Sequence, residues 1–132
     1  MRDANTVFHL AIPARDLDEA FDFYVKKLGC KLARRYHDRI TLDFFGDQVV
    51  CHLSDQFDEE PQMYPRHFGI TFSEKSQFDN LYKLAKQREV TFFRDLSTRF
   101  EGLIEEHLTY FLQDPSNNLL EFKYYYDPRM MY

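Results

Sequence analysis

The sequence predicts an α+β protein built from two βαβββ modules. Three observations support this: the same order of strands and helix occurs twice, each half opens with a histidine-bearing strand, and a polar segment separates the halves. The opening strands read HLAI from His9 and HFGI from His67, an offset of 58 residues. At 132 residues, 44% of them hydrophobic, the chain is long enough for one domain with a packed core. We expect a single domain, 1–132, with module one at 7–53, a linker at 54–65 and module two at 66–126.

In the first module, an opening strand is expected at residues 7–12, closed by Pro13. Asp16 is a typical helix N-cap, and Glu19 three residues later completes a capping box. Apolar residues then recur at helical spacing up to Gly29, which ends the helix. Three more strands are expected, at residues 31–36, 40–45 and 48–53.

The second module repeats this order after an acidic linker that contains two prolines. Its expected elements are a strand at 67–72, a helix at 74–87, a strand at 90–94, a long polar loop at 95–106, and hairpin strands at 107–112 and 118–124.

Composition excludes several classes of protein. The chain has 17 Lys and Arg against 22 Asp and Glu, mixed along its length, whereas a nucleic-acid-binding protein more often gathers basic residues on one face. No apolar run approaches the roughly 18 residues of a membrane span. The first residues lack the apolar core of a secretion signal, so we interpret the two cysteines as reduced thiols and expect a cytoplasmic protein. Cys51 is expected to be an inert core thiol.

Four polar residues occupy related positions in the two modules. His9 and His67 lie on the opening strands, and alternation places them on the face that carries small neighbours, opposite the large apolar residues. Aligning VVCHL with NLLEF pairs His52 with Glu121 on the last strands and puts both on that same face. Imidazole and carboxylate ligands together suit a divalent metal such as iron, zinc, nickel or manganese. The other reading of each histidine is a satisfied polar group on a half-exposed sheet.

The chain resembles the vicinal oxygen chelate superfamily, which includes glyoxalase I, extradiol dioxygenases and bleomycin- and fosfomycin-resistance proteins. The stretches that carry the resemblance are FHLAIPARDLDEAFDFYVKKLGCKL, HFGITF and DPSNNLLEFK. FFGDQVVCHL and TRFEG look like the small single-domain predicted dioxygenases of the extradiol type. The resemblance implies paired modules in a curved mixed sheet around a metal, with His9, His67 and Glu121 as its ligands.

The resemblance leaves three functions open. The first is an Fe(II) dioxygenase that cleaves a catechol-like ring, using two histidines and one glutamate and leaving metal positions open for substrate and O₂. The second is a glyoxalase-like lyase or isomerase, with zinc, nickel or manganese as alternative metals; His52 would then be a fourth ligand. The third is a non-catalytic small-molecule-binding protein of the resistance type, against which the complete ligand set argues.

Five further residues are candidates for substrate binding or catalysis. Either His52 or His107 is expected to be the acid–base histidine. Lys123 shares the face of Glu121 and is a candidate catalytic and substrate-binding residue, although a solvated lysine at the sheet rim fits equally well. Phe111 falls where the resemblance places an active-site tyrosine, and Arg99 is a candidate anchor for an anionic substrate.

The expected partners are a small-molecule substrate and a second copy of the chain. The resemblance implies the homodimer, and a chain of this size is too small to cover both faces of an eight-stranded sheet.

Overall fold

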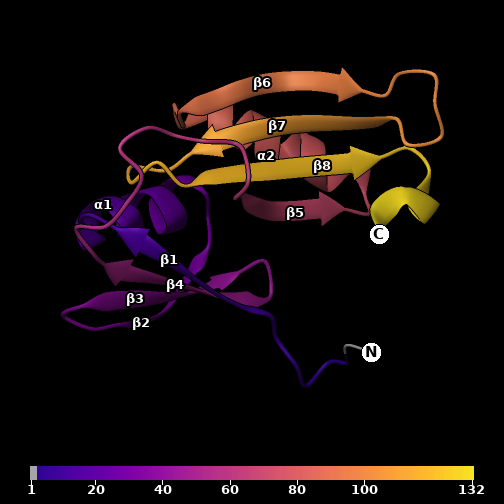
Figure 1. Ribbon diagram of the computed structural model, residues 1–132. Helices are drawn as coiled ribbons and strands as arrows, with labels where there is room; N and C mark the ends of the chain where they lie inside the picture. The colour runs from indigo at the N-terminus through magenta and orange to yellow at the C-terminus, as the bar shows by residue number, and fades with distance from the viewer. Residues whose placement is uncertain (1–2) are drawn as a thin grey trace. The chain divides into compact units, whose positions relative to one another are not determined.

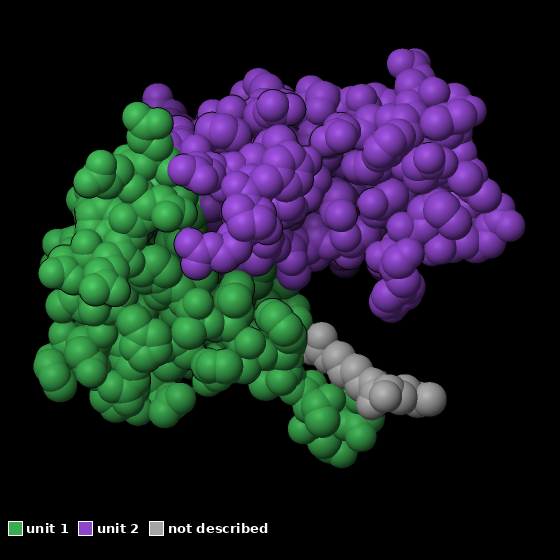
Figure 2. Space-filling view, viewed as in Figure 1, with its two compact units in different colours: residues 1–60, 115–118 green, residues 61–114, 119–132 purple. Residues whose placement is uncertain are grey.

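The computed structural model describes residues 3–132 (Figure 1). Contacts divide the chain into two compact units: unit 1 contains residues up to 60 together with 115–118, and unit 2 contains 61–114 and 119–132 (Figure 2). No helix among the described residues is long and apolar enough to span a bilayer. The elements are β1 (His9–Ala14), α1 (Leu17–Phe21), the π-helix η1 (Asp22–Lys27), β2 (Lys31–Arg35), β3 (Arg39–Phe44), β4 (Asp47–Leu53), β5 (Phe68–Phe72), α2 (Lys75–Gln87), β6 (Phe92–Arg99), β7 (His107–Gln113), β8 (Leu119–Tyr125) and the 3₁₀ helix η2 (Pro128–Met131).

The two βαβββ modules are confirmed, but they form two sheets instead of one. Each sheet has four strands, in the orders β1-β4-β3-β2 and β5-β8-β7-β6. In each, the opening strand is parallel to the last strand, and the remaining neighbours are antiparallel. The fold is therefore α+β with two mixed sheets.

The helix of unit 1 begins at the predicted cap and ends at the predicted Gly29, but its second half is a π-helix. The Asp16 carboxylate accepts a hydrogen bond from the backbone N–H of Glu19 at 2.9 Å, which caps the first turn of α1. The chain then widens into η1, where the N–H of Leu28 bonds the carbonyl of Phe23 at 2.9 Å, five residues back. Gly29, with φ of +85°, adopts the left-handed conformation that ends the helix.

Unit 2 is held together by aromatic side chains between its sheet and α2. Phe78 of α2 is fully buried, and its ring centroid lies 5.0 Å from that of Tyr110 on β7 and 6.4 Å from that of Phe72 on β5. Phe122 of β8 stacks on Tyr110 at 5.5 Å. Because side chains alternate along a strand, the residues next to these, including Glu121, lie on the sheet face opposite α2.

The strand β6 corrects the sequence prediction. Residues 95–106 were expected to form one long polar loop, but β6 continues through Arg99 and pairs with β7, with Arg99 opposite His107. Its side chains are mostly exposed because β6 is an edge strand with a single neighbour, so it lacks the apolar pattern of a buried strand. Only residues 100–106 connect it to β7.

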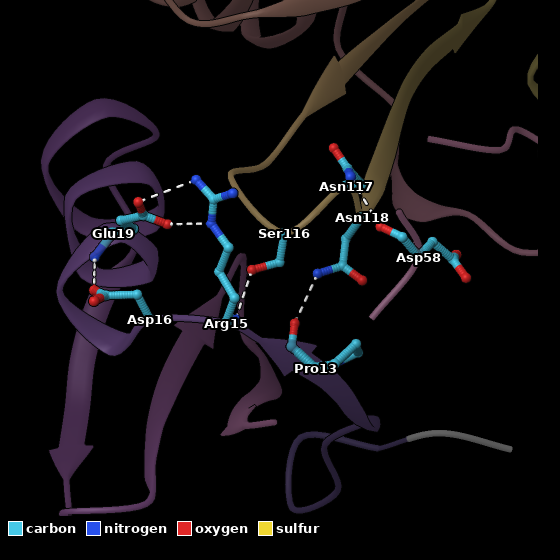
Figure 3. A network of polar contacts seen from close by, with 8 residues as sticks. All are labelled: Pro13, Arg15, Asp16, Glu19, Asp58, Ser116, Asn117 and Asn118. Atoms are coloured by element: carbon cyan, nitrogen blue, oxygen red, sulfur yellow. Dashed lines mark hydrogen bonds and ion pairs between the residues drawn. The ribbon is translucent and has the colours of Figure 1, made fainter. Parts of the chain in front are cut away.

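The turn between β7 and β8 belongs to unit 1 and is fixed there by side chains (Figure 3). The backbone N–H of Arg15 donates to Ser116 Oγ at 2.9 Å, and Asn118 Nδ2 donates to the carbonyl of Pro13 at 3.0 Å. Asn117 Nδ2 donates to the carbonyl of Asp58 at 2.8 Å. Ser116, Asn117 and Asn118 thus satisfy backbone groups of unit 1.

Candidate metal and substrate site

Two of the three predicted metal ligands are neighbours in unit 2. His67 directly precedes β5 and Glu121 lies on β8, and His67 Nε2 is 3.0 Å from Glu121 Oε2. Both side chains are largely enclosed, with 24% and 12% of their surfaces exposed. Gly69 lies directly opposite Glu121 in the β5–β8 ladder. A Cβ at this glycine would lie 1.6 Å from the Glu121 carbonyl oxygen, so only glycine permits this approach.

The orientation of His67 is set by its other ring nitrogen. Nδ1 lies 2.7 Å from the backbone carbonyl oxygen of Met63. A carbonyl only accepts, so Nδ1 carries the hydrogen and Nε2 is the nitrogen turned to Glu121. The rings of Tyr64 and Phe111 meet the imidazole edge-on, with centroids at 5.8 and 5.3 Å, and restrict its rotation.

Glu121 is oriented by a residue that the sequence analysis did not identify. The hydroxyl of Thr109, on β7, donates to Glu121 Oε1 at 2.8 Å, and Thr109 is only 3% exposed. This bond leaves Oε2 directed at His67. In the sequence, Thr109 is a hydroxyl residue within the otherwise largely apolar stretch HLTYFLQ. It lies two residues from Phe111 and therefore on the same face of the strand, which could have marked it as a site residue.

This pair fits a divalent metal ion. Two ligand atoms about 2.1 Å from a metal and at right angles to each other lie about 3.0 Å apart, which matches the separation of Nε2 and Oε2. The outer hydrogen bonds to Met63 and Thr109 are of the kind that metal-ligating histidines and carboxylates make. Among residues 3–132, no three His, Cys, Asp or Glu side chains are grouped closely enough to hold a metal. The full ligand set therefore stays a prediction.

The third predicted ligand, His9, lies on β1 of unit 1. Its Nδ1 is 2.6 Å from Gln48 Oε1, the side-chain oxygen of the residue that faces it on β4. An amide oxygen accepts, so Nδ1 again carries the hydrogen and Nε2 is the ring nitrogen left for another partner. His9 and His67 are thus oriented in the same way: Nδ1 of each ring donates to an oxygen acceptor in its own unit.

The alignment of His52 with Glu121 is wrong by two residues. In unit 2, Glu121 faces Gly69, and the 58-residue offset makes Ala11 the counterpart of Gly69. Ala11 faces Val50, so Val50 is the counterpart of Glu121. His52 is exposed at the end of β4 and faces Pro13, two residues further along the strand. An apolar side chain therefore occupies the position where the repeat would supply a fourth ligand.

Phe111, Lys123 and His107 lie on the face of the unit 2 sheet that carries Glu121. Phe111 lies directly opposite Glu121 and is 2% exposed. Lys123 shares the face of Glu121, with Nζ 5.5 Å from the centroid of the Tyr125 ring. His107 is 6% exposed, with Nδ1 2.9 Å from the carbonyl of Glu105, so its environment is enclosed.

Arg99 ends an edge strand of unit 2, and both cysteines belong to unit 1. Arg99, which was expected in a loop, is the last residue of β6, and its guanidinium carbon lies 5.5 Å from the centroid of the Phe100 ring. Cys51 is 0% exposed, as expected for a core thiol. Burial, together with the nearby Asp43 carboxylate, raises the pKa of Cys30 to about 12, so that thiol stays protonated.

Comparisons with known proteins agree with this architecture. Residues 6–122 match the family model described as the Glyoxalase/Bleomycin resistance protein/Dioxygenase superfamily. A crystal structure described as a glyoxalase/bleomycin resistance protein/dioxygenase from Alicyclobacillus acidocaldarius is 80% identical, with all of both chains covered and a TM-score of 0.97.

More distant structures share the fold. The fosfomycin resistance protein FosX from Listeria monocytogenes is 14% identical, with 91% of this chain and 93% of that one covered and a TM-score of 0.71. An integron cassette protein from V. cholerae is 22% identical, with 95% and 98% covered and a TM-score of 0.63. No curated protein matches the chain. From the family match and the 80% identical relative, the chain belongs to the Glyoxalase/Bleomycin resistance protein/Dioxygenase superfamily, the vicinal oxygen chelate superfamily that its sequence resembles.

Proposed function

We propose that this protein is a metal-dependent enzyme, an Fe(II) dioxygenase of the extradiol type that cleaves a catechol-like small molecule. The observation that carries the proposal is Val50, which stands where the repeat would otherwise provide a fourth protein ligand. A set of two histidines and one carboxylate leaves adjacent metal positions open, as non-haem Fe(II) oxygenases require. A four-ligand site of the glyoxalase kind leaves fewer metal positions open for substrate and O₂.

In this proposal, His9, His67 and Glu121 hold the metal. The hydrogen bonds to Gln48 and Met63 engage Nδ1 of each ring, so Nε2 is the nitrogen that would bind the metal. When bound, Fe(II) supplies chelation of two vicinal substrate oxygens and activation of O₂. Ring cleavage places both oxygen atoms of O₂ in the product, so no external reductant is required.

The other side chains are proposed to bind substrate and move protons. Phe111 closes the site beside Glu121, and Lys123 and Arg99 provide positive charge for an anionic substrate. His52 is proposed as the acid–base group, since it lies on the β1–β4 face that carries His9. A positioned acid–base group typically contributes ~10²–10⁴-fold to a rate.

Oxygen consumption tests the function directly. Protein reconstituted with Fe(II) under nitrogen is mixed with a panel of catechols in aerated buffer, and oxygen uptake is followed. We expect uptake with at least one catechol, and its loss in His67→Ala together with loss of bound iron. No uptake, combined with turnover of a hemithioacetal by the nickel or zinc form under nitrogen, would replace the dioxygenase with the lyase. Inactivity in both assays would favour a binding protein.

His52→Ala separates two roles for that residue. If His52 moves protons, iron content stays at the wild-type level while turnover falls by ~10²–10⁴-fold. A parallel fall in iron affinity would instead make it a ligand.

We also propose that the chain forms a homodimer, as the resemblance implies. Sedimentation at micromolar concentration is expected to give twice the 16 kDa chain mass. A 16 kDa species alone would contradict the dimer.

A further inference from the structure

A row of polar side chains crosses the unit 2 sheet one step beyond Glu121. Lys123, on β8, lies directly opposite Thr71 on β5 and Thr109 on β7. Ser97 on β6 continues the row opposite Thr109. These residues share the face of Glu121, opposite α2, because side chains two residues apart on a strand point the same way. The row therefore combines one cation with hydroxyl groups beside a proposed metal ligand.

The charge of Lys123 is not neutralised within the described part of the chain. Two other lysines of unit 2 have carboxylate partners: Lys75 with Asp79 and Lys86 with Asp95. Lys123 is half-buried, and no Asp or Glu among residues 3–132 forms an ion pair with it. Its contact is the Tyr125 ring, which leaves the ammonium hydrogens available. A half-buried cation without a counter-ion is a natural partner for an anionic ligand.

The hydroxyls on either side of Lys123 differ in what they offer. The hydrogen of Thr109 is committed to Glu121, so this hydroxyl has only acceptor capacity left. Thr71 makes no hydrogen bond from its side chain within residues 3–132, so its hydroxyl is free to donate. An anion on Lys123 would therefore receive a second hydrogen bond from the β5 side.

We propose that Lys123 and Thr71 form an anion subsite, and that the substrate carries a carboxylate on the end remote from its metal-binding oxygens; this rests on the proposed dioxygenase function. Two residues along a strand correspond to about 7 Å, roughly the length of a benzene ring with its substituents. A catechol carboxylate therefore spans from the His67–Glu121 pair to the Lys123 row.

A pair of compounds that differ in charge and little in shape tests this subsite. The compounds are 3,4-dihydroxybenzoate and 3,4-dihydroxybenzamide. For the wild type we expect kcat/KM to favour the acid by about 10- to 100-fold, the usual effect of a hydrogen-bonded charge. Lys123→Met should bring the ratio of kcat/KM for the acid to kcat/KM for the amide close to one, while Lys123→Arg should keep most of the preference. Lys83→Met is the matched control, because it removes an exposed cation from α2, on the opposite side of the sheet.

Binding without turnover separates this inference from the proposed function. Calorimetry under nitrogen, with the protein as purified, measures the affinity of both compounds for the wild type and Lys123→Met. One outcome is that the wild type binds the acid more tightly than the amide and that Lys123→Met abolishes this difference. That result, without oxygen uptake, would support the anion subsite and contradict the dioxygenase function. Equal kcat/KM for the two compounds would keep the dioxygenase and overturn the subsite. Absence of both binding and turnover would overturn both.

Discussion

The hydroxyl of Thr109 donates a hydrogen bond to Glu121, and its removal tests how the carboxylate is oriented. Thr109→Val replaces the hydroxyl with a methyl group of nearly the same size, at a position that is 3% exposed. The change removes the 2.8 Å bond to Oε1 and leaves that oxygen without this donor. The Glu121 side chain then loses the restraint that directs Oε2 toward His67.

The size of the effect follows from the charge and burial of the bond. A hydrogen bond to a charged group contributes about 1.5–3 kcal/mol, and loss of an outer partner of a metal ligand typically lowers metal affinity about 10- to 100-fold. We therefore expect the dissociation constant for Fe(II) or Co(II) to rise by about 10- to 100-fold in Thr109→Val. The free energy of unfolding of the metal-free protein should fall by about 1–3 kcal/mol, because a buried acceptor loses its donor.

Competition with a coloured chelator measures the metal affinity of each variant. Thr109→Ser keeps the hydroxyl and should retain an affinity close to that of the wild type. Thr41→Val is a matched control, since Thr41 is a buried strand residue, 2% exposed, on β3 of unit 1. An affinity of Thr109→Val within twofold of the wild type would refute the role assigned to this hydroxyl.

Two further predictions concern stability. Gly69→Ala should lower the free energy of unfolding by at least about 3 kcal/mol, because its Cβ would lie 1.6 Å from a backbone oxygen of β8. Ala11→Gly, at the equivalent position of unit 1, should lower it by about 1 kcal/mol or less. Equal urea midpoints for the two variants would contradict this prediction. Hydrogen bonds, first of all from Lys86, lower the pKa of Asp95 to about 2, so this carboxylate stabilises the fold above its unfolded pKa of about 3.9 and the benefit is lost as pH falls toward 2. Asp95→Asn should therefore be less stable than the wild type at pH 7, by less than about 1 kcal/mol because the Lys86–Asp95 ion pair is exposed. The difference between their thermal unfolding midpoints should vanish near pH 2. A difference that does not change with pH would contradict this prediction.

Local patterns in the sequence determined the repeat and the faces of its strands. The Asp16 cap forms as its spacing with Glu19 indicates, because a capping box involves residues three apart. His67 and Glu121 lie on the same face of the unit 2 sheet, since alternation along a strand is a local property. These features depend on neighbours in the chain, so they are readable without the tertiary structure.

Strand register was decided only by long-range pairing. Aligning the last strands by residue type paired His52 with Glu121, whereas the β1–β4 and β5–β8 ladders make Val50 the counterpart. A shift of two residues keeps every side chain on its face, so the hydrophobic pattern cannot detect it. Likewise, β6 continues to Arg99 because β7 supplies its hydrogen-bond partners, and its exposed polar residues carry no strand signal.

The groups that orient the proposed ligands also required the tertiary structure. The acceptor for His67 is the backbone carbonyl of Met63, and a carbonyl is present at every residue, so the sequence does not distinguish it. The donor for Glu121 is Thr109, which meets it only because β7 and β8 pair in one particular register. The sequence thus determined which residue types are available for a metal and on which face they lie. Folding decided which atom of each side chain is left free, because that depends on hydrogen bonds between segments distant along the chain.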